Sequence, residues 1–244
     1  LEDITLRALR VLRSVDRIAC EDTRQTRKLL DRYGITTPTI SSHEHNEGAR
    51  SLQLIEELQG AARIAVVSDA GTPGISDPGM VLAAAAVAAG IAVYPIPGPS
   101  AVLAALVASG LDTEHFFFFG FLPSKAGARR TALEDMAASI HATTTVVFYE
   151  APHRIAETLG DVEAVWGGPC RVVLARELTK IHEEFLRGTV AEVRQQIAAR
   201  QSLRGEMVLL VEAPSATSAA LPANTSVLAQ LAELEKSENL DEKD

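Results

Sequence analysis

Cysteine is scarce in this sequence of 244 residues, and its scarcity excludes two kinds of protein. Only two cysteines are present, Cys20 and Cys170, and they lie far apart, each next to a strand-like run. A disulfide framework or a cysteine metal site needs several such residues at close spacing. We therefore expect both cysteines to be reduced residues of a core.

Long hydrophobic runs are also absent. The most apolar helical stretch, residues 81–89, is short and rich in alanine, whereas a membrane span needs about 20 apolar residues. The N-terminus lacks the basic and then apolar pattern of a secretion signal. We expect no membrane association, and a cytoplasmic location by default.

Positive charge is in deficit. The chain has 32 acidic residues against 23 lysines and arginines, for a net charge of −9, and nearly half of that excess lies after Ala213. Proteins that coat nucleic acid nonspecifically neutralise phosphates with Lys and Arg. That class is excluded, although a local basic site is not.

Several well-known motifs are missing. Neither of the two glycine-rich loops has the spacing of a dinucleotide fingerprint or a P-loop, and no Gly-x-Ser-x-Gly elbow occurs. These motifs mark nucleotide-binding and hydrolase sites. No internal repeat is evident, so repeat architectures are not indicated either.

The stretch that stands out is residues 68–79, which contains three glycines, two prolines and two aspartates. It follows the apolar run 64–67 and precedes an alanine-rich helix. In open α/β sheets, ligands bind at the carboxyl ends of strands. A second Gly/Pro loop, residues 95–100, follows the next expected strand. An ordinary turn and a ligand-binding loop both remain possible interpretations.

Strand-like and helical runs alternate along the chain, which predicts an α/β fold with a mostly parallel N-terminal sheet and a mixed C-terminal sheet. Residues 1–112 form the first expected domain, 113–212 the second, and 213–244 a linker and acidic tail with a short helix at 227–234. We expect strands at 17–20, 64–67, 92–94, 116–119, 144–149, 171–175 and 206–211, and helices at 6–15, 21–33, 50–60, 80–90, 101–109, 129–139, 153–159 and 190–199.

Polar residues mark where several helices start and glycines mark where they end. Asp3 or Thr5 would cap the first helix, and Asp22 or Thr23 the second. Ser100 would cap the helix at 101–109. Gly34 and Gly110 are the expected stops.

Two polar clusters have competing interpretations. Arg24, Arg27 and Lys28 share one helix face, which indicates either a solvated surface or a phosphate-binding one. His43 and His45 lie two residues apart, but no third ligand is suitably spaced. The pattern favours a polar loop, and we expect no metal.

Seven motifs together resemble a known family. In order and spacing they are similar to the small-subunit ribosomal RNA methyltransferases I of the tetrapyrrole methylase superfamily, from Leu1 to about Glu212. The form Asp69-Ala70-Gly71-Thr72-Pro73 is similar to the RNA enzymes rather than to their corrin-methylating relatives. The motifs are residues 20–24, 42–47, 68–79, 95–100, 120–123, 148–154 and 175–180.

The resemblance implies a two-domain tetrapyrrole methylase fold, a homodimer, and S-adenosylmethionine-dependent 2′-O-methylation of a cytidine in small-subunit ribosomal RNA. It also implies a donor site between the domains. Gly and Pro suit such a site because they allow close main-chain approach and keep loops stiff. The implied donor-binding residues are Ser68, Asp69, Ala70, Gly71, Thr72, Pro73, Pro97, Gly98, Ser100, Ala101, Tyr149, Glu177, Leu178 and Met207.

Methyl transfer to a hydroxyl requires a proton acceptor. Glu150 is the first candidate, followed by Asp22 and His45, with His153 as a further one for which local packing is an equal alternative. Lysines and arginines would contact RNA phosphate or sugar. The expected RNA-binding residues are Arg24, Arg27, Lys28, Lys125, Arg129, Arg130, Arg154 and Lys180.

The sequence departs from this family at both ends. Members begin with a strand that ends in Thr-Pro-Ile-Gly-Asn just before the equivalent of Leu1, and they carry a longer basic C-terminal segment. We expect residues to be missing before Leu1. Two alternatives therefore stay open: a methyltransferase acting on a tetrapyrrole, and a truncated protein that binds the donor without turnover.

Overall fold

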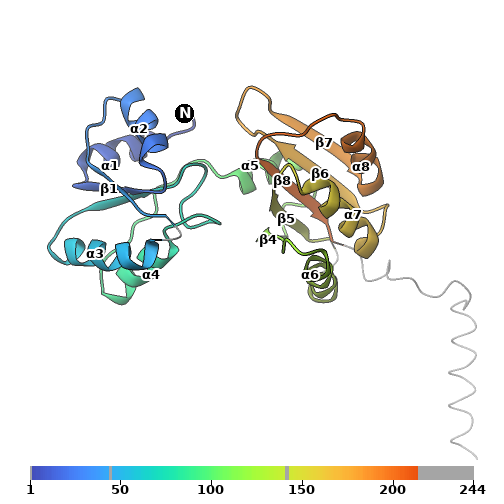
Figure 1. The fold of residues 1–244 in the computed structure, drawn as a ribbon, viewed down its shortest axis with the longest axis horizontal. Helices are drawn as coiled ribbons and strands as arrows, with labels where there is room; N and C mark the ends of the chain where they lie inside the picture. The colour runs from blue at the N-terminus through green and yellow to red at the C-terminus, as the bar shows by residue number, and fades with distance from the viewer. Residues whose placement is uncertain (1, 44–45, 141–142, 214–244) are drawn as a thin grey trace, which may run out of the picture. The chain divides into compact units, whose positions relative to one another are not determined.

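The computed structural model describes residues 2–43, 46–140 and 143–213. Contacts within the chain divide it into two compact units (Figure 1). The first contains residues up to Ala108 with two short segments, Phe118–Phe121 and Glu177–Glu183, and the second contains most of the remainder. The tail helix expected at 227–234 lies outside the described residues.

The first unit has a three-stranded parallel sheet in the order β2-β1-β3. Its parallel pairing and its alternation of strands with helices confirm the predicted α/β class. The elements are α1 (Leu6–Ser14), β1 (Arg17–Cys20), α2 (Thr23–Arg32), β2 (Thr39–Ser41), α3 (Glu47–Gln59), β3 (Ile64–Val67), α4 (Met80–Ala88) and α5 (Ala101–Ser109).

The central strand β1 explains why helices cover both faces of this sheet. Successive side chains of a strand point to opposite faces. Ile18 and Cys20 are buried in one cluster with residues of α1 and α2. Ala19 is buried in another cluster with Leu54 of α3 and Leu82 of α4. The two sets of helices are visible on either side of β1 in Figure 1.

The predicted helix signals are confirmed at several ends. The Thr5 hydroxyl accepts a hydrogen bond from the Ala8 amide at 3.1 Å. Asp22 accepts one from the Arg24 amide at 2.8 Å. Gly34 and Gly110 both have positive φ, 61° and 78°, a conformation that glycine adopts without strain at helix C-termini.

The prediction of a strand at 92–94 is wrong. This segment has no regular structure, and Val93 and Tyr94 are 49% and 79% exposed. A strand is stable only when a neighbour completes its hydrogen bonds and covers its side chains. In the described part of the chain, the first sheet consists of β2, β1 and β3, and residues 92–94 pair with none of them. Their main-chain groups and side chains are therefore left exposed.

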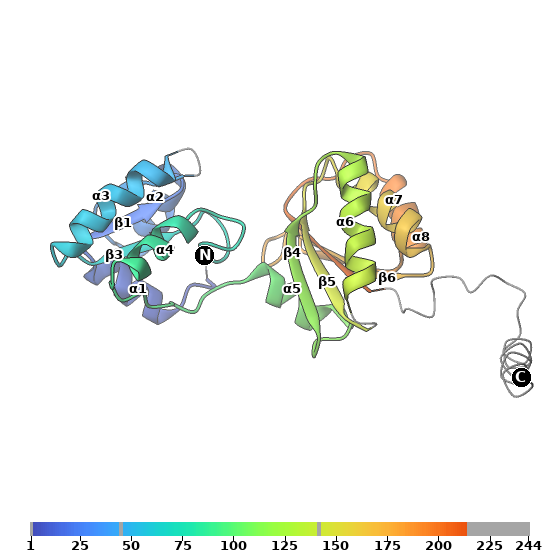
Figure 2. The same cartoon turned by 90° about the horizontal axis from the view of Figure 1, so that it is seen from below.

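The C-terminal part of the chain has a five-stranded sheet in the order β4-β5-β8-β6-β7. Strand β8 pairs antiparallel with both β5 and β6, and β6 pairs antiparallel with β7. Helices α6, α7 and α8 form a row beside it (Figure 2). The elements are β4 (Phe116–Phe121), α6 (Ala126–Ser139), β5 (Thr145–Glu150), α7 (Ile155–Trp166), β6 (Arg171–Arg176), β7 (Glu184–Thr189), α8 (Val190–Ala198) and β8 (Met207–Glu212).

Strands β2 and β7 were not predicted, nor were the full lengths of α6 and α7. Strand β7 reads Glu-Phe-Leu-Arg-Gly-Thr and lies at the sheet edge, where an apolar face is not required. Helix α6 begins at Ala126 despite Gly127, and α7 continues past Gly160 to Trp166. Because glycine lowers helix propensity by only about 1 kcal/mol, packing overrides it.

Helix packing in the second unit is fixed by buried aromatic and aliphatic side chains. The Trp166 indole N–H of α7 donates to the Leu133 carbonyl of α6 at 2.9 Å, and its ring lies 6.4 Å from that of Phe148 in β5. Strand β8 is almost entirely buried. The row of helices is therefore anchored to the centre of the sheet.

Candidate functional site

The loop at residues 68–79 lies at the carboxyl end of β3 and is stabilised by its own main chain. The Gly74 amide donates to the Pro78 carbonyl at 3.2 Å, and the Ile75 amide donates to the Thr72 carbonyl at 3.2 Å. Gly71, Gly74, Ser76 and Gly79 all have positive φ. A loop with this many left-handed residues has a defined shape.

The end of this loop is held by helix α3. The Gly79 amide, just before α4, donates to the Glu47 carboxylate at 2.6 Å. A charge-assisted hydrogen bond of this length is among the stronger ones in proteins. The sequence does not indicate Glu47 as a loop anchor, because Glu47 and Gly79 are far apart along the chain.

The loop at 95–100 is joined to the first loop. The Thr72 hydroxyl donates to the Pro99 carbonyl at 3.0 Å, and the Thr5 hydroxyl donates to the Pro97 carbonyl at 3.1 Å. Ser100 accepts from the Leu103 amide at 3.4 Å, which confirms its predicted capping position. The two predicted donor-binding loops therefore lie side by side within the first unit.

The surface of these loops leaves main-chain atoms accessible. A side chain built at Gly71 or at Gly98 would meet no atom within 4 Å. Residues 69–72 and 92–99 are all exposed. A ligand that approaches the main chain closely is thus accommodated at both glycines.

Asp69 joins the ends of two adjacent strands. Its carboxylate accepts a hydrogen bond from the Asp22 amide at 3.3 Å, and β1 and β3 pair with Cys20 opposite Val67. The side chain is exposed. The structure therefore brings together the predicted residues Asp22 and Asp69, from motifs that are distant in sequence.

Asp22 is less suited to accept a proton than the sequence indicated. Its carboxylate accepts two side-chain hydrogen bonds from Arg24, at 3.1 and 2.7 Å. The Arg24 side chain and amide lower the Asp22 pKa to about 2. A group of such low pKa is a weak base at neutral pH.

The polar loop before α3 is only partly described. The His43 amide donates to the Asn46 side-chain oxygen at 2.9 Å, and the Asn46 amide nitrogen lies 3.2 Å from His43 Nε2. His45, a candidate base, lies outside the described residues. Among the described residues, no group of three or more potential metal ligands occurs.

Several of the predicted site residues lie at or just after neighbouring strand ends of the five-stranded sheet. Met207, the first residue of β8, pairs with Glu150 of β5 and with Arg176 of β6. Tyr149 precedes Glu150, and Glu177 follows Arg176. Glu177 has a φ of 50°, which is unusual for a residue with a side chain. Leu178 follows in the same turn.

Glu150 is buried and fully engaged, contrary to the expectation of a proton acceptor. Its side chain has no exposed surface and lies 3.3 Å from Arg154. It accepts hydrogen bonds from the Thr158 hydroxyl at 2.6 Å and from the Ala151 amide at 2.8 Å. A carboxylate enclosed in this way does not reach a substrate hydroxyl, and its role is structural.

Arg129 and Arg154 are likewise turned inward rather than toward RNA. The Arg129 side chain is 1% exposed and donates to the Asp161 carboxylate at 2.6 Å. The Arg154 side chain is 19% exposed and donates to the Leu122 carbonyl at 2.7 Å. A charge that is paired inside the protein is not available to a ligand. Neither arginine is therefore placed to make the expected phosphate contacts.

The remaining expected RNA contacts are exposed. Arg130 is 56% exposed, with its Nε bound to Asp161. Lys28 donates to Gln25 at 2.6 Å, and Lys180 pairs with Glu177 at 2.9 Å. Pairs at exposed positions are weak and exchange readily. The exposed set is Arg24, Arg27, Lys28, Lys125, Arg130 and Lys180.

Both cysteines are free thiols, but only Cys20 is a buried core residue as predicted, because Cys170 is partly exposed. Burial raises the pKa of Cys20, and burial together with Glu212 raises that of Cys170 to about 12. Protonated thiols are poor nucleophiles. Neither cysteine therefore belongs to the reactive part of the site. No helix among the described residues is long and apolar enough to cross a membrane.

Comparison with known proteins identifies related sequences. The family model for tetrapyrrole (corrin/porphyrin) methylases matches residues 1–194. A protein of Mesorhizobium japonicum is 50% identical over 211 residues, covering 86% of this chain and 71% of the relative. One of Halalkalibacterium halodurans is 49% identical over 212 residues, covering 87% and 72%. Both carry the name ribosomal RNA small subunit methyltransferase I.

Solved structures are similar in fold at low identity. The methyltransferase CobJ superposes with a TM-score of 0.62 at 19% identity, covering 88% of this chain and 89% of that one. A diphthine synthase superposes with a TM-score of 0.63 at 14% identity, covering 87% and 85%. At this identity the likeness concerns the fold alone, and it confirms the predicted fold class.

Proposed function

Because this chain belongs to the tetrapyrrole methylase family and, within it, to the ribosomal RNA small subunit methyltransferases I, we propose that it methylates the 2′-hydroxyl of one cytidine in small-subunit ribosomal RNA. The observation that carries the proposal is the 50% identity to a relative with that name over 86% of the chain. Identity to the solved methyltransferase CobJ is 19%. We place this activity in the cytoplasm.

The proposed methyl donor is S-adenosylmethionine, which supplies a methyl group on a positively charged sulfur. The loops of the first unit have the chemistry to hold it. Gly71 and Gly98 leave the main chain open to a ligand, and the bond from Thr72 to Pro99 holds both loops in one arrangement. Asp69 offers an exposed carboxylate to hydroxyl or amino groups. We propose that residues 68–73 and 97–101 bind the donor.

Further donor contacts are proposed at the ends of strands β5, β6 and β8. Tyr149 and Met207 lie at neighbouring strand ends of the five-stranded sheet, and the strained turn at Glu177 directly follows β6. Strained backbone away from glycine is common at ligand sites. We propose these residues and Leu178 as donor contacts, and a homodimer as the assembled enzyme.

Transfer to a hydroxyl depends mainly on positioning the two reactants, and removal of the hydroxyl proton adds about 10² to 10⁴-fold. Glu150 is enclosed, and Asp22 is a weak base because Arg24 lowers its pKa. His153 is exposed just before α7. We therefore propose a histidine, His153 or His45, as the proton acceptor.

The decisive experiment is transfer of a labelled methyl group. Purified small ribosomal subunits that lack the modification are incubated with the protein and labelled S-adenosylmethionine, and the label is mapped along the ribosomal RNA. A 2′-O-methyl group removes the hydroxyl needed for alkaline cleavage of the adjacent phosphodiester. We expect label at one cytidine and resistance to alkali at that position.

Three results would contradict this proposal. Label on a base would place the methyl group elsewhere on the nucleotide. Transfer to a corrinoid or porphyrin precursor, tested in parallel, without transfer to ribosomal subunits would assign the chain to tetrapyrrole chemistry. Donor binding without any transfer would indicate a binding protein without turnover.

A further inference from the structure

Three consecutive main-chain carbonyls before helix α6 are bound by two arginines. Arg154 donates to the carbonyls of Leu122 and Pro123, at 2.7 and 3.2 Å. Arg129 donates to the carbonyl of Ser124 at 3.2 Å. A guanidinium is a rigid fork of donors. The two side chains therefore fix the path of residues 122–124, which we call the clamped loop.

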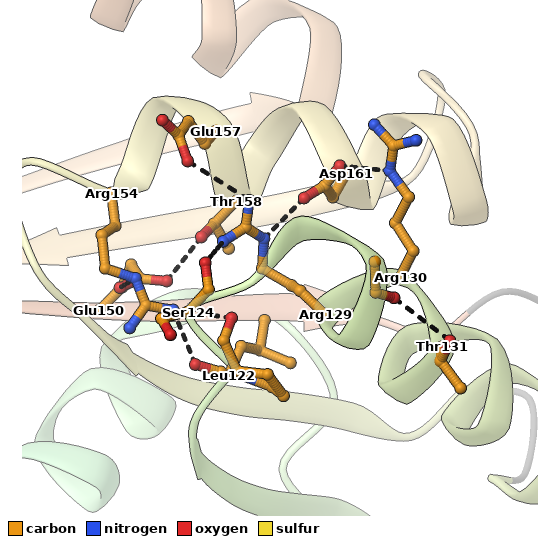
Figure 3. Close-up of polar contacts among 12 residues, drawn as sticks. Leu122, Ser124, Arg129, Arg130, Thr131, Glu150, Arg154, Glu157, Thr158 and Asp161 are labelled. Atoms are coloured by element: carbon orange, nitrogen blue, oxygen red, sulfur yellow. Dashed lines mark hydrogen bonds and ion pairs between the residues drawn. The ribbon is translucent and has the colours of Figure 1, made fainter.

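Both arginines are themselves held by carboxylates of β5 and α7 (Figure 3). Arg129 lies 2.6 Å from Asp161 and 3.5 Å from Glu157. Arg154 lies 3.3 Å from Glu150, which also accepts a hydrogen bond from Thr158. Every charge in this cluster faces an opposite charge. Within the described residues, Arg154 Nε makes no hydrogen bond, whereas the terminal nitrogens of the two arginines donate to the clamped loop.

The central carboxylate of this network stays ionised. Burial raises the pKa of Asp161, but hydrogen bonds from Arg130 and Arg129 outweigh that effect, and the pKa is lowered overall. Removing one partner of a buried pair leaves the other uncompensated, which is costly. The network therefore holds its geometry at neutral pH.

The clamped loop leads directly into an exposed segment. Residues 124–128 are all exposed, whereas Leu122 before them and Arg129 after them are buried. Lys125 is the cation of this segment, and it lies immediately before the first residue of α6. Buried anchors on both sides thus present Lys125 at the surface on a fixed main chain.

We propose that Arg129 and Arg154 are positioning residues that preform residues 122–125 as an RNA contact, with Lys125 as the side chain that meets a phosphate. The proposal rests on the proposed function for its RNA ligand. A segment ordered before binding loses less conformational entropy when it binds. The arginines thus contribute to RNA affinity through Lys125, without touching RNA.

A double-mutant cycle tests whether the arginines act through Lys125. The variants are Lys125→Ala, Arg129→Lys and the combination, and the measurement is the Kd for purified small ribosomal subunits by filter binding. Lysine at position 129 retains a positive charge beside Asp161 but does not reproduce the fork of Arg129. We expect each single variant to weaken binding, Lys125→Ala by roughly tenfold. We expect the combination to weaken it no further than Lys125→Ala alone.

Non-additivity is the readout that a merely structural role would not give. Arg200→Lys is the matched control, because Arg200 forms a similar network with Glu184 in the same unit, with bonds of 2.7 and 2.5 Å. We expect Arg200→Lys to leave the Kd unchanged. Arg154→Lys repeats the test at the other anchor if Arg129→Lys does not fold. Hydrogen exchange should show faster exchange of the amide of residue 129, which donates to the Lys125 carbonyl at 2.9 Å, in both clamp variants than in the control.

The outcomes of these experiments distinguish failure of the clamp from failure of the proposed function. An unchanged Kd for folded Arg129→Lys or Arg154→Lys overturns the clamp, as does additivity with Lys125→Ala. An equal loss of affinity in Arg200→Lys overturns it as well, because general destabilisation would then explain the effect. Failure of the unmodified protein to bind small subunits overturns both the clamp and the proposed function. If the protein binds small subunits and transfers the methyl group, but the effects of Lys125→Ala and Arg129→Lys on the Kd are additive, the clamp alone is overturned.

Discussion

Lys125, Arg129 and Arg130 show how tertiary structure separates cations that look alike in sequence. Within one short segment, Lys125 is exposed, Arg130 is 56% exposed, and Arg129 is 1% exposed. Arg129 is buried because Asp161 compensates its charge, whereas isolated burial of a charge is prohibitive. A basic cluster therefore contains both surface contacts and internal supports, and only burial distinguishes them.

Asp69 carries the residue-level prediction for the donor site. We expect Asp69→Ala to weaken S-adenosylmethionine binding by roughly 10-fold or more, since it removes a charged hydrogen-bond acceptor. Asp69→Asn is the matched variant, because its side-chain oxygen still accepts from the Asp22 amide while the charge is lost. Isothermal calorimetry gives the Kd of each. Equal affinity in Asp69→Ala and the unmodified protein would remove Asp69 from the site.

At the scale of elements, helix ends and strand ends determine where the functional residues lie. The turn at 177–179 joins β6 to β7, the loop at 68–79 joins β3 to α4, and the clamped loop joins β4 to α6. Rigid elements place these loops, and the loops carry the exposed polar groups. Helix α8 directly follows the edge strand β7, and a capping box marks its N-terminus.

The capping box of α8 gives the element-level prediction. The Thr189 side chain accepts from the Glu192 amide at 3.3 Å, and the Glu192 carboxylate accepts from the Thr189 amide at 2.8 Å. We expect Thr189→Ala to lower the free energy of unfolding by about 1 kcal/mol. Thr189→Ser, which keeps the hydroxyl, should have little effect. Urea unfolding followed by circular dichroism measures both, and equal stability of all three proteins would contradict the prediction.

At the scale of the whole molecule, the net charge of −9 opposes RNA binding away from a local basic site. The exposed cations proposed for RNA are Arg24, Arg27, Lys28, Lys125, Arg130 and Lys180. With Arg129 and Arg154 internal, fewer phosphates are neutralised than the sequence indicated. Affinity should therefore depend only moderately on salt.

The salt dependence of binding tests how many cations contact RNA. Each phosphate neutralised on single-stranded RNA contributes about 0.7 to the slope of log affinity against log salt, so the six cations allow a slope of at most about −4. We expect Lys125→Ala to reduce the magnitude by about 0.7. The Kd for small subunits is measured between low and physiological salt. A steeper slope would show that additional cations contact RNA.

Local sequence was sufficient to predict the α/β class, the strand at 17–20, the strand at 64–67 and the cap at Ser100. These follow from local periodicity and turn chemistry, which act over a few residues. The two glycine-rich loops were also identified from sequence, because Gly and Pro punctuate chains locally. The hydrogen bond from Thr72 to Pro99 that joins the two loops was not predicted.

The accessibility of the polar residues depends on contacts between distant parts of the chain. Glu150 and Arg129 resemble functional residues in sequence, yet Thr158 and Asp161, distant in the chain, enclose them. The segment at 92–94 has strand-forming residues but lacks a neighbouring strand in the described sheet. Burial, ion pairing and strand pairing depend on partners far along the chain, so local sequence does not fix them.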